Sequence, residues 1–510
     1  MKKVIYRLQV CLLVLVFFGC DDFLETENKT GLESDKNYQT AEDVSTNMLG
    51  IFASVQDVMH KIIIFNELRS DALEPSDTAP IELLSIANYN DNASNSIIKP
   101  NEFYRIIVNC NDFLQNAESY KLSGDYMSED QFNAHMSDVL RIKYWTYWNI
   151  SKIYGKAYYF DDPLDQIEDI DKVTNLVPMT LEEMIPFLIE KIENSTYDLK
   201  SKVDWRALFD ANTDFNFYSI DAEALLGELY LWNEDYQMAA NIYHRILNDR
   251  PDINITLSGE TYFKNGYRNL FSSGLSGLNN HILTGVEYTE TNGQLNKTGQ
   301  LFFQEGGERQ LLVSKAYVDM SLSQESTDKK DGDFYRGQRT SFNVGDRAVK
   351  KYTFAAKPRV PVYRAAELHL KYAEALNQLG EFDKALALLN QGVSKYWNGS
   401  NFESPFDDGS WHPKWRNAKG LRGRVKLASR VLDDALSDEE KKTLIDMWIL
   451  EEGALELAFE GKRLESLIRV SLRYNDPSIL AEKVASKFEE SQVSTIESLL
   501  MNQEKWFWPY

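Results

Sequence analysis

The sequence predicts a mainly α-helical protein made of tetratricopeptide-like helical hairpins, with long loops and a few short strands. Three observations support this fold class: a helical pair at 361–394, a second pair at 219–247, and a loop-rich interval between them. In both pairs apolar and small residues recur at helical spacing, so each half is predicted to form an amphipathic helix. The repetition of one arrangement indicates a helical-repeat scaffold.

Small residues occupy matching places in the two pairs. Gly227 and Ala239 are 12 positions apart, and so are Ala373 and Ala385. This offset is typical of a tetratricopeptide-like hairpin, in which two antiparallel helices approach closely. Gly380 lies at the corner of the second pair, where glycine adopts a positive φ at little cost.

The remaining helices are predicted in chain order from the same periodicity. They are expected at about 41–60, 101–120, 132–155, 180–198 and 440–470. Thr40 and Asp43 are placed to cap the first of them. Loops are expected at 74–100 and over most of 250–360, where Gly, Asn, Ser and Thr are frequent and short strands such as HILTGVEY occur.

Composition and charge exclude some function classes. A chain of 510 residues with 43% hydrophobic residues can bury a large core. Its formal net charge of −23 argues against nucleic-acid binding, because no net basic surface is available to displace counterions from phosphates. Two of the three cysteines, Cys11 and Cys20, lie in or at the end of the leader, so no disulfide framework is expected. Cys110 stands in an apolar run and is predicted to be a buried, inert thiol.

The first 19 residues have the features of a secretory signal. A basic start precedes a short apolar run from Val10 to Phe18, which is too short to cross a bilayer. The run ends in Gly19-Cys20, and a small residue before Cys at this place resembles a bacterial lipobox. The resemblance implies that Cys20 becomes a lipidated N-terminus, and several acyl chains on one residue would anchor the protein stably.

Several segments together resemble the SusD/RagB family of surface nutrient-binding lipoproteins. The matching segments are Cys-Asp-Asp-Phe-Leu at 20–24, the aromatic helix from Arg141 to Gly155, Arg364-x-x-Glu367 with Tyr-Ala-Glu-Ala at 372–375, Glu460-Gly461-x-Arg463 with Leu-Ile-Arg at 467–469, and the final KWFWPY. Members of this family bind glycans at the cell surface and are partners of TonB-dependent outer-membrane transporters. The blocks at 361–377 and 448–469 are the most specific parts of the resemblance.

The resemblance implies an organisation and a function. It implies a signal peptide at 1–19, an N-terminal SusD-like helical region at 20–310, and a C-terminal region at 311–510 packed with it as one body. It implies an outer-membrane lipoprotein that captures an oligosaccharide, or less often another nutrient such as a peptide, without cleaving it. The expected partner is a SusC-like TonB-dependent transporter, and no cofactor or metal is expected.

Glycan binding requires flat apolar rings for the sugar faces and amides or carboxylates for the hydroxyls, and loops supply these best. Three loops offer such residues. The candidate ligand-binding residues are Asn88, Tyr89, Asn90, Trp205, Trp411 and Trp415. The first of these loops lies where starch-binding relatives carry sugar-stacking aromatics, but it lacks their tryptophans.

Catalytic groups were sought among the acids and histidines. Glu452, Glu456 and Glu460 share one helix face, whereas glycosidases hold two acids on opposite sides of a sugar. The row is therefore interpreted as part of an ion-pair seam with Lys462, Arg463 and Arg469, which follow it. The six histidines are scattered, and no zinc-binding or nucleotide-binding motif occurs.

Two other function classes remain open from the sequence. A surface enzyme that hydrolyses glycans is disfavoured because no catalytic constellation is found. A helical-repeat scaffold that binds only protein on its concave face is the third reading. Glycan binding that is lost when loop rings are removed would distinguish the expected function from both.

Overall fold

The structure is a computed structural model of the chain. The described residues are 38–123, 127–164, 173, 175–203, 219–250, 267–272, 281–288, 296–303, 309–352, 359–390, 392–393, 406 and 419–510. The leader, Cys20, Trp205, Trp411 and Trp415 lie outside these ranges, so the expectations for them stay predictions.

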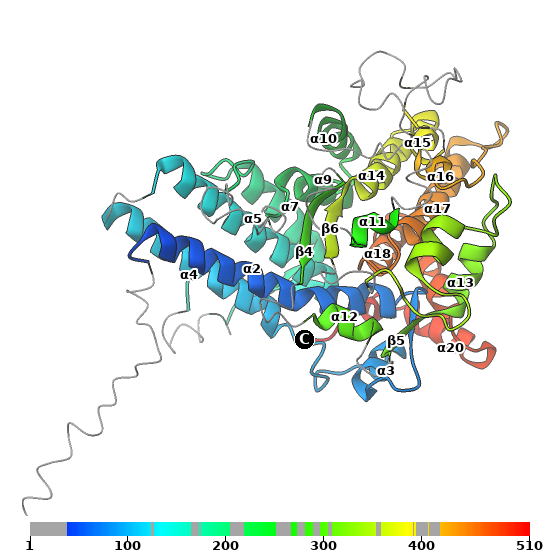
Figure 1. Cartoon of the computed structure of the whole chain (residues 1–510), viewed down its shortest axis with the longest axis horizontal. Helices are drawn as coiled ribbons and strands as arrows, with labels where there is room; N and C mark the ends of the chain where they lie inside the picture. The colour runs from blue at the N-terminus through cyan, green and yellow to red at the C-terminus, as the bar shows by residue number, and fades with distance from the viewer. Residues whose placement is uncertain are drawn as a thin grey trace, which may run out of the picture.

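Long helices form the N-terminal part, and α2, α4 and α5 run side by side (Figure 1). The helices are α2 (Ala41–Ile63), which continues as the π-helix η2 (Ile64–Leu68), α4 (Asn101–Ser123), α5 (Glu129–Tyr154) and α7 (Leu181–Glu193). All four α-helices were predicted from the sequence. The predicted cap is confirmed, because the side chains of Thr40 and Asp43 each accept the other residue's backbone N–H.

Helix α2 is the chain's most membrane-like described segment. Ala41–Leu68 is long and apolar enough to cross a bilayer, but 72% of its apolar window is buried inside the protein. It is therefore explained as a core helix of this fold. Cys110 of α4 is buried as predicted, and burial raises the pKa of its thiol to about 12.

The two predicted hairpins are present, and they pack on each other. They consist of α9 (Ala222–Trp232) with α10 (Tyr236–Asp249), and α14 (Ala365–Gln378) with α15 (Phe382–Leu389). Helix α10 packs against α14, which stacks one hairpin on the other. A Cβ at Gly227 would lie 2.9 Å from the Tyr243 ring, so the close approach is real, although it is to Tyr243 rather than to Ala239. Gly380 makes the turn with φ +80°.

The interval between the hairpins is less loop-like than predicted. The segment HILTGVEY does contain a strand, β4 (Ile282–Glu287). Three short helices and a π-helix also form there: α11 (Tyr267–Ser272), α12 (Lys297–Phe302), α13 (Lys315–Leu322) and η7 (Phe334–Ser341). The six-residue and eight-residue helices are too short to show a clear period, which is why the sequence pattern missed them.

Three two-stranded sheets tie distant segments together. Strand β1 (Leu73–Pro75) pairs with β5 (Leu311–Val313), β2 (Lys156–Ala157) with β3 (Met179–Thr180), and β4 with β6 (Arg359–Arg364), all antiparallel. Two of these strand pairs, β1–β5 and β4–β6, join residues on either side of position 310, where the N-terminal region is expected to end. The predicted loop at 74–100 was wrong in part, because it contributes β1 and the helix α3 (Ile81–Ala87).

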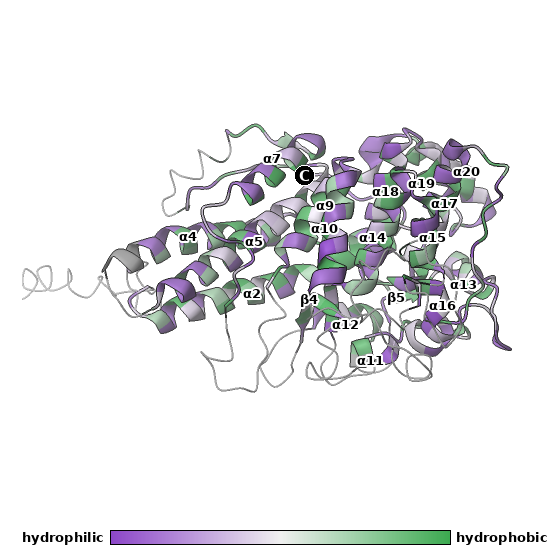
Figure 2. Ribbon diagram, turned by 90° about the horizontal axis from the view of Figure 1, so that it is seen from above, coloured by the Kyte–Doolittle hydropathy of each residue, from purple (hydrophilic) through white to green (hydrophobic). Residues whose placement is uncertain are grey.

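The C-terminal part is a series of shorter helices. They are α16 (Leu421–Arg424), α17 (Asp438–Glu456), α18 (Arg463–Arg473), α19 (Ser478–Ala485), α20 (Glu490–Leu500) and the 3-10 helix η10 (Gln503–Trp506). The single helix predicted at 440–470 is wrong, because the chain turns between α17 and α18. Phe459 and Gly461 both adopt positive φ there. Apolar residues mark one side of most helices and polar residues the other (Figure 2), which is the pattern that lets one core form between them.

Candidate functional site

A cleft lies where the closing segment 503–510 returns to the N-terminal helices. It has a volume of about 510 Å³, a size in the range of small-molecule sites. The backbone N–H of Trp508 donates to the carbonyl of Ile153 at 2.9 Å, which fixes the segment beside the end of α5. The cleft is lined by Arg69, Tyr89, Asp91, Tyr154, Gly155, Lys156, Gln503, Glu504, Lys505, Phe507, Trp508, Pro509 and Tyr510.

Arg69 holds one wall of the cleft together. Its guanidinium lies over the ring of Tyr89, 4.4 Å from the centroid. Its Nη1 donates to both carboxylate oxygens of Asp91, at 3.2 and 3.1 Å, and its Nη2 donates to the carbonyl of Lys505 at 2.5 Å. One buried side chain therefore connects the loop after α3 to the closing segment.

Aromatic rings form much of the rest of the lining. Trp508 is 2% exposed and packs edge-on against Phe65, with ring centroids 5.3 Å apart. Phe507 is partly exposed and rests on Gly155, where a Cβ would lie 3.0 Å from the ring. The hydroxyl of Tyr510 donates to the carbonyl of Lys156 at 2.8 Å, and the Lys156 ammonium lies 5.4 Å from the Tyr510 ring centroid. The cleft thus combines half-exposed rings with polar groups, the two requirements of sugar binding.

Tyr89 lines this cleft, but not as an exposed loop ring. It is 9% exposed, its hydroxyl donates to the carbonyl of Arg69, and burial raises its pKa above the usual value. The ring of Tyr89 is therefore packed into the wall of the cleft rather than exposed in a loop. The backbone of Tyr89 has φ 57°, so this residue of the loop after α3 lies in the left-handed region, which few residues other than glycine adopt.

The two asparagines predicted beside Tyr89 do not line the cleft. The Nδ2 of Asn88 donates to the carbonyl of Leu84 at 2.8 Å and closes the end of α3. Asn90 is exposed, and its backbone N–H donates to the carbonyl of Ser85. Both amides belong to a turn, and a role in binding stays a prediction for them.

The closing segment was missed as a source of binding residues. In the sequence, KWFWPY was used only as a mark of family resemblance. Its four aromatic residues within five positions, from Trp506 to Tyr510, were the available signal. No local pattern shows that such a segment returns to Arg69 and Lys156, so the cleft depends on contacts between distant parts of the chain.

The row Glu452, Glu456 and Glu460 is buried and paired, as the ion-pair interpretation predicted. Arg336 contacts Glu452 at 2.6 Å and Glu456 at 2.9 Å. Arg364 contacts Glu456 at 2.8 Å and Glu460 at 2.7 Å. We call these five residues the ion-pair cluster. Lys351 and Arg422 extend it, through contacts to Glu460 and Glu452 respectively.

The predicted cationic partners of that row were wrong. Each of the three basic residues that follow it pairs with a different acid. Lys462 contacts Glu367 at 3.0 Å, Arg463 contacts Asp71 at 2.7 Å, and Arg469 contacts Glu374 at 2.6 Å. The turn at Gly461 is the reason, because it points α18 away from the acids of α17.

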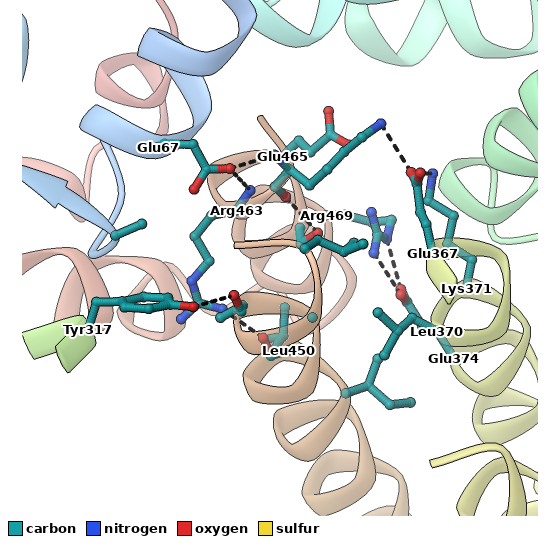
Figure 3. A pocket seen from close by; sticks show the side chains of 17 residues that line it. Glu67, Tyr317, Glu367, Leu370, Lys371, Glu374, Leu450, Arg463, Glu465 and Arg469 are labelled. Carbon is teal, nitrogen blue, oxygen red and sulfur yellow. Dashed lines mark hydrogen bonds and ion pairs between the residues drawn. The ribbon is translucent and has the colours of Figure 1, made fainter. Parts of the chain in front are cut away.

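All residues of these pairs except Asp71 line a small cavity beside α18 (Figure 3). Its volume is about 30 Å³, room for one or two water molecules. One carboxylate oxygen of Glu67 accepts the backbone N–H groups of Gly461, Lys462 and Arg463, at 2.7, 2.8 and 3.4 Å. Burial raises the pKa of Glu67 to about 7. The Glu67 carboxylate thus anchors the start of α18 beside the cavity. The cavity itself is too small for a sugar.

No group of three or more His, Cys, Asp or Glu side chains within the described ranges is arranged to hold a metal ion. We take the cleft as the candidate ligand site because it combines partly exposed rings with polar groups.

The sequence and the fold are both similar to those of known proteins. Residues 290–510 match the model of the SusD family. SusD-like protein P2 of Formosa agariphila is 24% identical over 526 residues, which cover 92% of this chain and 91% of that protein. SusD-like protein P25 of the same organism is 25% identical over 165 residues, which cover 30% of each.

Solved structures have the same architecture. A SusD superfamily protein from Bacteroides vulgatus superposes with a TM-score of 0.63 at 13% identity, covering 89% of this chain and 91% of that one. A SusD-like carbohydrate binding protein from Bacteroides fragilis superposes with a TM-score of 0.57 at 14% identity, covering 88% and 89%. At these identities the structural matches establish a shared fold. The sequence matches, at residues 290–510 and to the two SusD-like proteins, are to the same family.

Proposed function

The chain belongs to the SusD/RagB family, and from that premise we propose that it binds an oligosaccharide at the cell surface without cleaving it. We further propose that it passes the ligand to a TonB-dependent outer-membrane transporter. The observation that carries the proposal is the cleft of about 510 Å³, in which half-exposed rings stand beside hydrogen-bonding groups. A related protein from Bacteroides fragilis is described as carbohydrate binding.

The rings of the cleft are suited to binding because they are already held in place. Phe507 is supported by Gly155, and Tyr510 is fixed by its hydrogen bond to Lys156. A ring that is ordered before the ligand arrives loses little side-chain entropy on binding. Sugar C–H faces can then bury against these rings while hydroxyl groups meet the polar wall.

Binding without cleavage agrees with the state of the carboxylates. A glycosidase needs two acids that flank the bond to be cleaved. In the cleft, Asp91 is engaged by both contacts from Arg69, and Glu504 lies on the exposed rim. The acids of α17 are enclosed by arginines in the ion-pair cluster. The glycan-hydrolysing alternative would therefore need acids other than these.

A glycan array probed with the chain lacking residues 1–20 tests the binding proposal. The best ligand is then used in calorimetry on Phe507→Ala, and on Trp205→Ala and Trp411→Ala for the rings predicted from the sequence. Removing a ring that contacts the sugar is expected to weaken binding by roughly 1–3 kcal/mol, the value of burying one such side chain. Phe303→Ala is the matched control, because Phe303 is 58% exposed and does not line the cleft.

Three results would count against this proposal. Loss of binding in Phe303→Ala but not in Phe507→Ala would place the site elsewhere on the surface. Release of new reducing ends from the ligand would favour the hydrolytic alternative. A chain that binds no glycan on the array but still forms a complex with a membrane protein would favour the scaffold alternative.

Surface location and the transporter partnership are tested on cells. Cys20 is proposed to carry the lipid anchor, so Cys20→Ala should move the protein from the membrane fraction to the soluble fraction. Metabolic fatty-acid labelling should label the wild type and not the variant, and an unlabelled wild type would refute the anchor. Crosslinking in intact outer membranes should yield a complex with a TonB-dependent transporter, and a complex equally abundant in Cys20→Ala cells would show that anchoring is not needed for it.

A further inference from the structure

A group of partly exposed aromatic rings begins beside Tyr510, at the edge of the cleft. Tyr158 and Phe160 follow strand β2, and both rings are partly exposed. The ring of Tyr158 meets the ring of Tyr510 at 88°, with the centroids 5.4 Å apart. Phe160 lies nearly parallel to Tyr104 of α4, at an interplanar angle of 14° and a centroid separation of 6.3 Å. We call Tyr104, Tyr158 and Phe160 the ring platform. Because Tyr510 lines the cleft, the platform continues that lining onto the neighbouring surface.

A chain of hydrogen bonds connects the platform to the cleft. The backbone N–H of Tyr158 donates to the hydroxyl of Tyr104 at 2.8 Å. The hydroxyls of Tyr104 and Tyr510 lie 3.0 Å apart, and that of Tyr510 donates to the carbonyl of Lys156 at 2.8 Å. Since a hydroxyl has one proton, and Tyr510 uses its proton on Lys156, Tyr104 is the donor to Tyr510. The bonds therefore join the segment after β2, helix α4 and the closing segment in one network.

The segment that carries the platform is held at several further points. The backbone N–H of Phe160 donates to the hydroxyl of Tyr147 at 3.0 Å. The Nδ2 of Asn111 donates to the carbonyls of Phe160 and Asp162, both at 3.1 Å. Strand β2, directly before Tyr158, pairs with β3. Rings that are fixed in this way lose little side-chain entropy when a ligand binds.

Core packing explains the other rings of this segment, but not Tyr158. Tyr104, Tyr159 and Phe160 all pack against the hydrophobic core, which accounts for their being aromatic. Within the described part of the chain, the ring of Tyr158 packs on Tyr510 at the edge of the cleft and not on that core. A partly exposed ring in this position is suited to contact the C–H face of a sugar.

We infer that the ring platform is an extension of the binding site, and that the cleft and the platform together take an oligosaccharide longer than the cleft alone encloses. This inference rests on the proposed function and specifies the length of its ligand. A cleft of about 510 Å³ encloses a drug-sized ligand, which a disaccharide is and a hexasaccharide is not. Surface rings are also common where proteins bind each other. The continuity of the platform with a concave cleft favours a sugar chain that passes from one to the other.

Length ladders test the extension. The probes are cello-, xylo- and laminari-oligosaccharides of two to six units, with fractions of the same lengths from the array-selected polysaccharide if it differs. A longer chain offers more binding registers to wild type and variant alike. The quantity compared is therefore the ratio of the hexasaccharide to the disaccharide association constant. Calorimetry should give a ratio about tenfold larger in the wild type than in Tyr158→Ala, a difference of about 1.4 kcal/mol.

Further variants separate the ring from its surroundings. Tyr158→Ala should keep the disaccharide affinity, because Tyr510 and the rest of the cleft remain. Tyr158→Phe keeps the ring and should keep the wild-type ratio. Tyr104→Phe removes the hydroxyl that holds the backbone of Tyr158, so it should lower the ratio by a smaller factor. Tyr197→Ala is the matched control, since Tyr197 is partly exposed and belongs to neither the cleft nor the platform.

The outcomes distinguish the extension from the function it rests on. Equal ratios in the wild type and Tyr158→Ala, or an equal fall in Tyr197→Ala, would overturn the extension and leave glycan binding in the cleft intact. Unchanged ratios with a weaker crosslinked transporter complex in Tyr158→Ala would make the platform a protein-binding surface instead. Failure of every array glycan and every ladder to bind would overturn the proposed function itself.

Discussion

The ion-pair cluster and the cleft are both rich in charge, but they differ in how that charge is used. In the cluster, Glu456 contacts both Arg336 and Arg364, and all three side chains are fully buried. In the cleft, Lys156 has no carboxylate partner in the described ranges, and the Nε of buried Arg69 has no acceptor. The carboxylates of the first region are all paired within the protein, whereas the second keeps a partly exposed lysine with no carboxylate partner in the described part of the chain.

The difference shows why residue type alone does not mark a site. The row of acids on α17 has the composition expected of a hydrolase, yet its partners make it structural. Burial by itself would raise the pKa of Glu456, but Arg364, Arg424 and Arg336 hold it well below the usual range. The cleft has fewer charges, and one of them, Lys156, has no carboxylate partner among the described residues. The following changes test that contrast, in order of decreasing effect.

Glu456→Gln should be the most damaging of these changes. It leaves two buried arginines without one of their anionic partners, and breaking a buried ion pair costs about 3–5 kcal/mol. The measurement is the urea midpoint of unfolding. Glu504→Gln in the cleft is the control, since an exposed acid should change stability by less than about 0.5 kcal/mol. Equal midpoints for the two variants would show that the cluster does not stabilise the fold.

Acid should remove the stabilisation that the buried pair of Glu374 with Arg469 and Arg473 supplies. Burial alone would raise the pKa of Glu374, but the guanidinium groups of Arg469 and Arg473 lower it to about 2. A carboxylate whose pKa is lower in the folded state stabilises above its unfolded pKa, near 4.5, and loses that contribution as pH falls toward 2. Urea midpoints should therefore drop between about pH 5 and pH 2, with a smaller drop in Glu374→Gln.

Tyr89→Phe should have the smallest effect. It removes the hydroxyl that donates to the carbonyl of Arg69 and should cost about 1 kcal/mol, the net value of one hydrogen bond. Tyr197→Phe is the control, because its hydroxyl bonds to Glu118 at an exposed site. A loss at Tyr89 no greater than at Tyr197 would show that this wall of the cleft is not held by that bond.

The sequence by itself determined the helical character, the hairpins and the first cap. These features depend on local patterns: the spacing of apolar residues, glycine at a corner, and Thr40 three residues before Asp43. It also indicated the family, because the blocks around 361–377 and 448–469 are continuous in sequence. A helix period or a motif is complete within one segment, so no distant contact is needed to recognise it.

Only the tertiary structure decided which charged residues are structural and where a ligand can enter. The partners of Glu456 are Arg336 and Arg364, which lie 120 and 92 positions away in the chain. The cleft likewise depends on Arg69 reaching the carbonyl of Lys505, 436 positions away. A charged side chain is paired or unpaired according to the residues that fold around it. Those residues come from distant parts of the chain, and no local sequence pattern connects them. For the same reason, the sequence could place Tyr89 in a loop but could not show that Arg69 covers its ring.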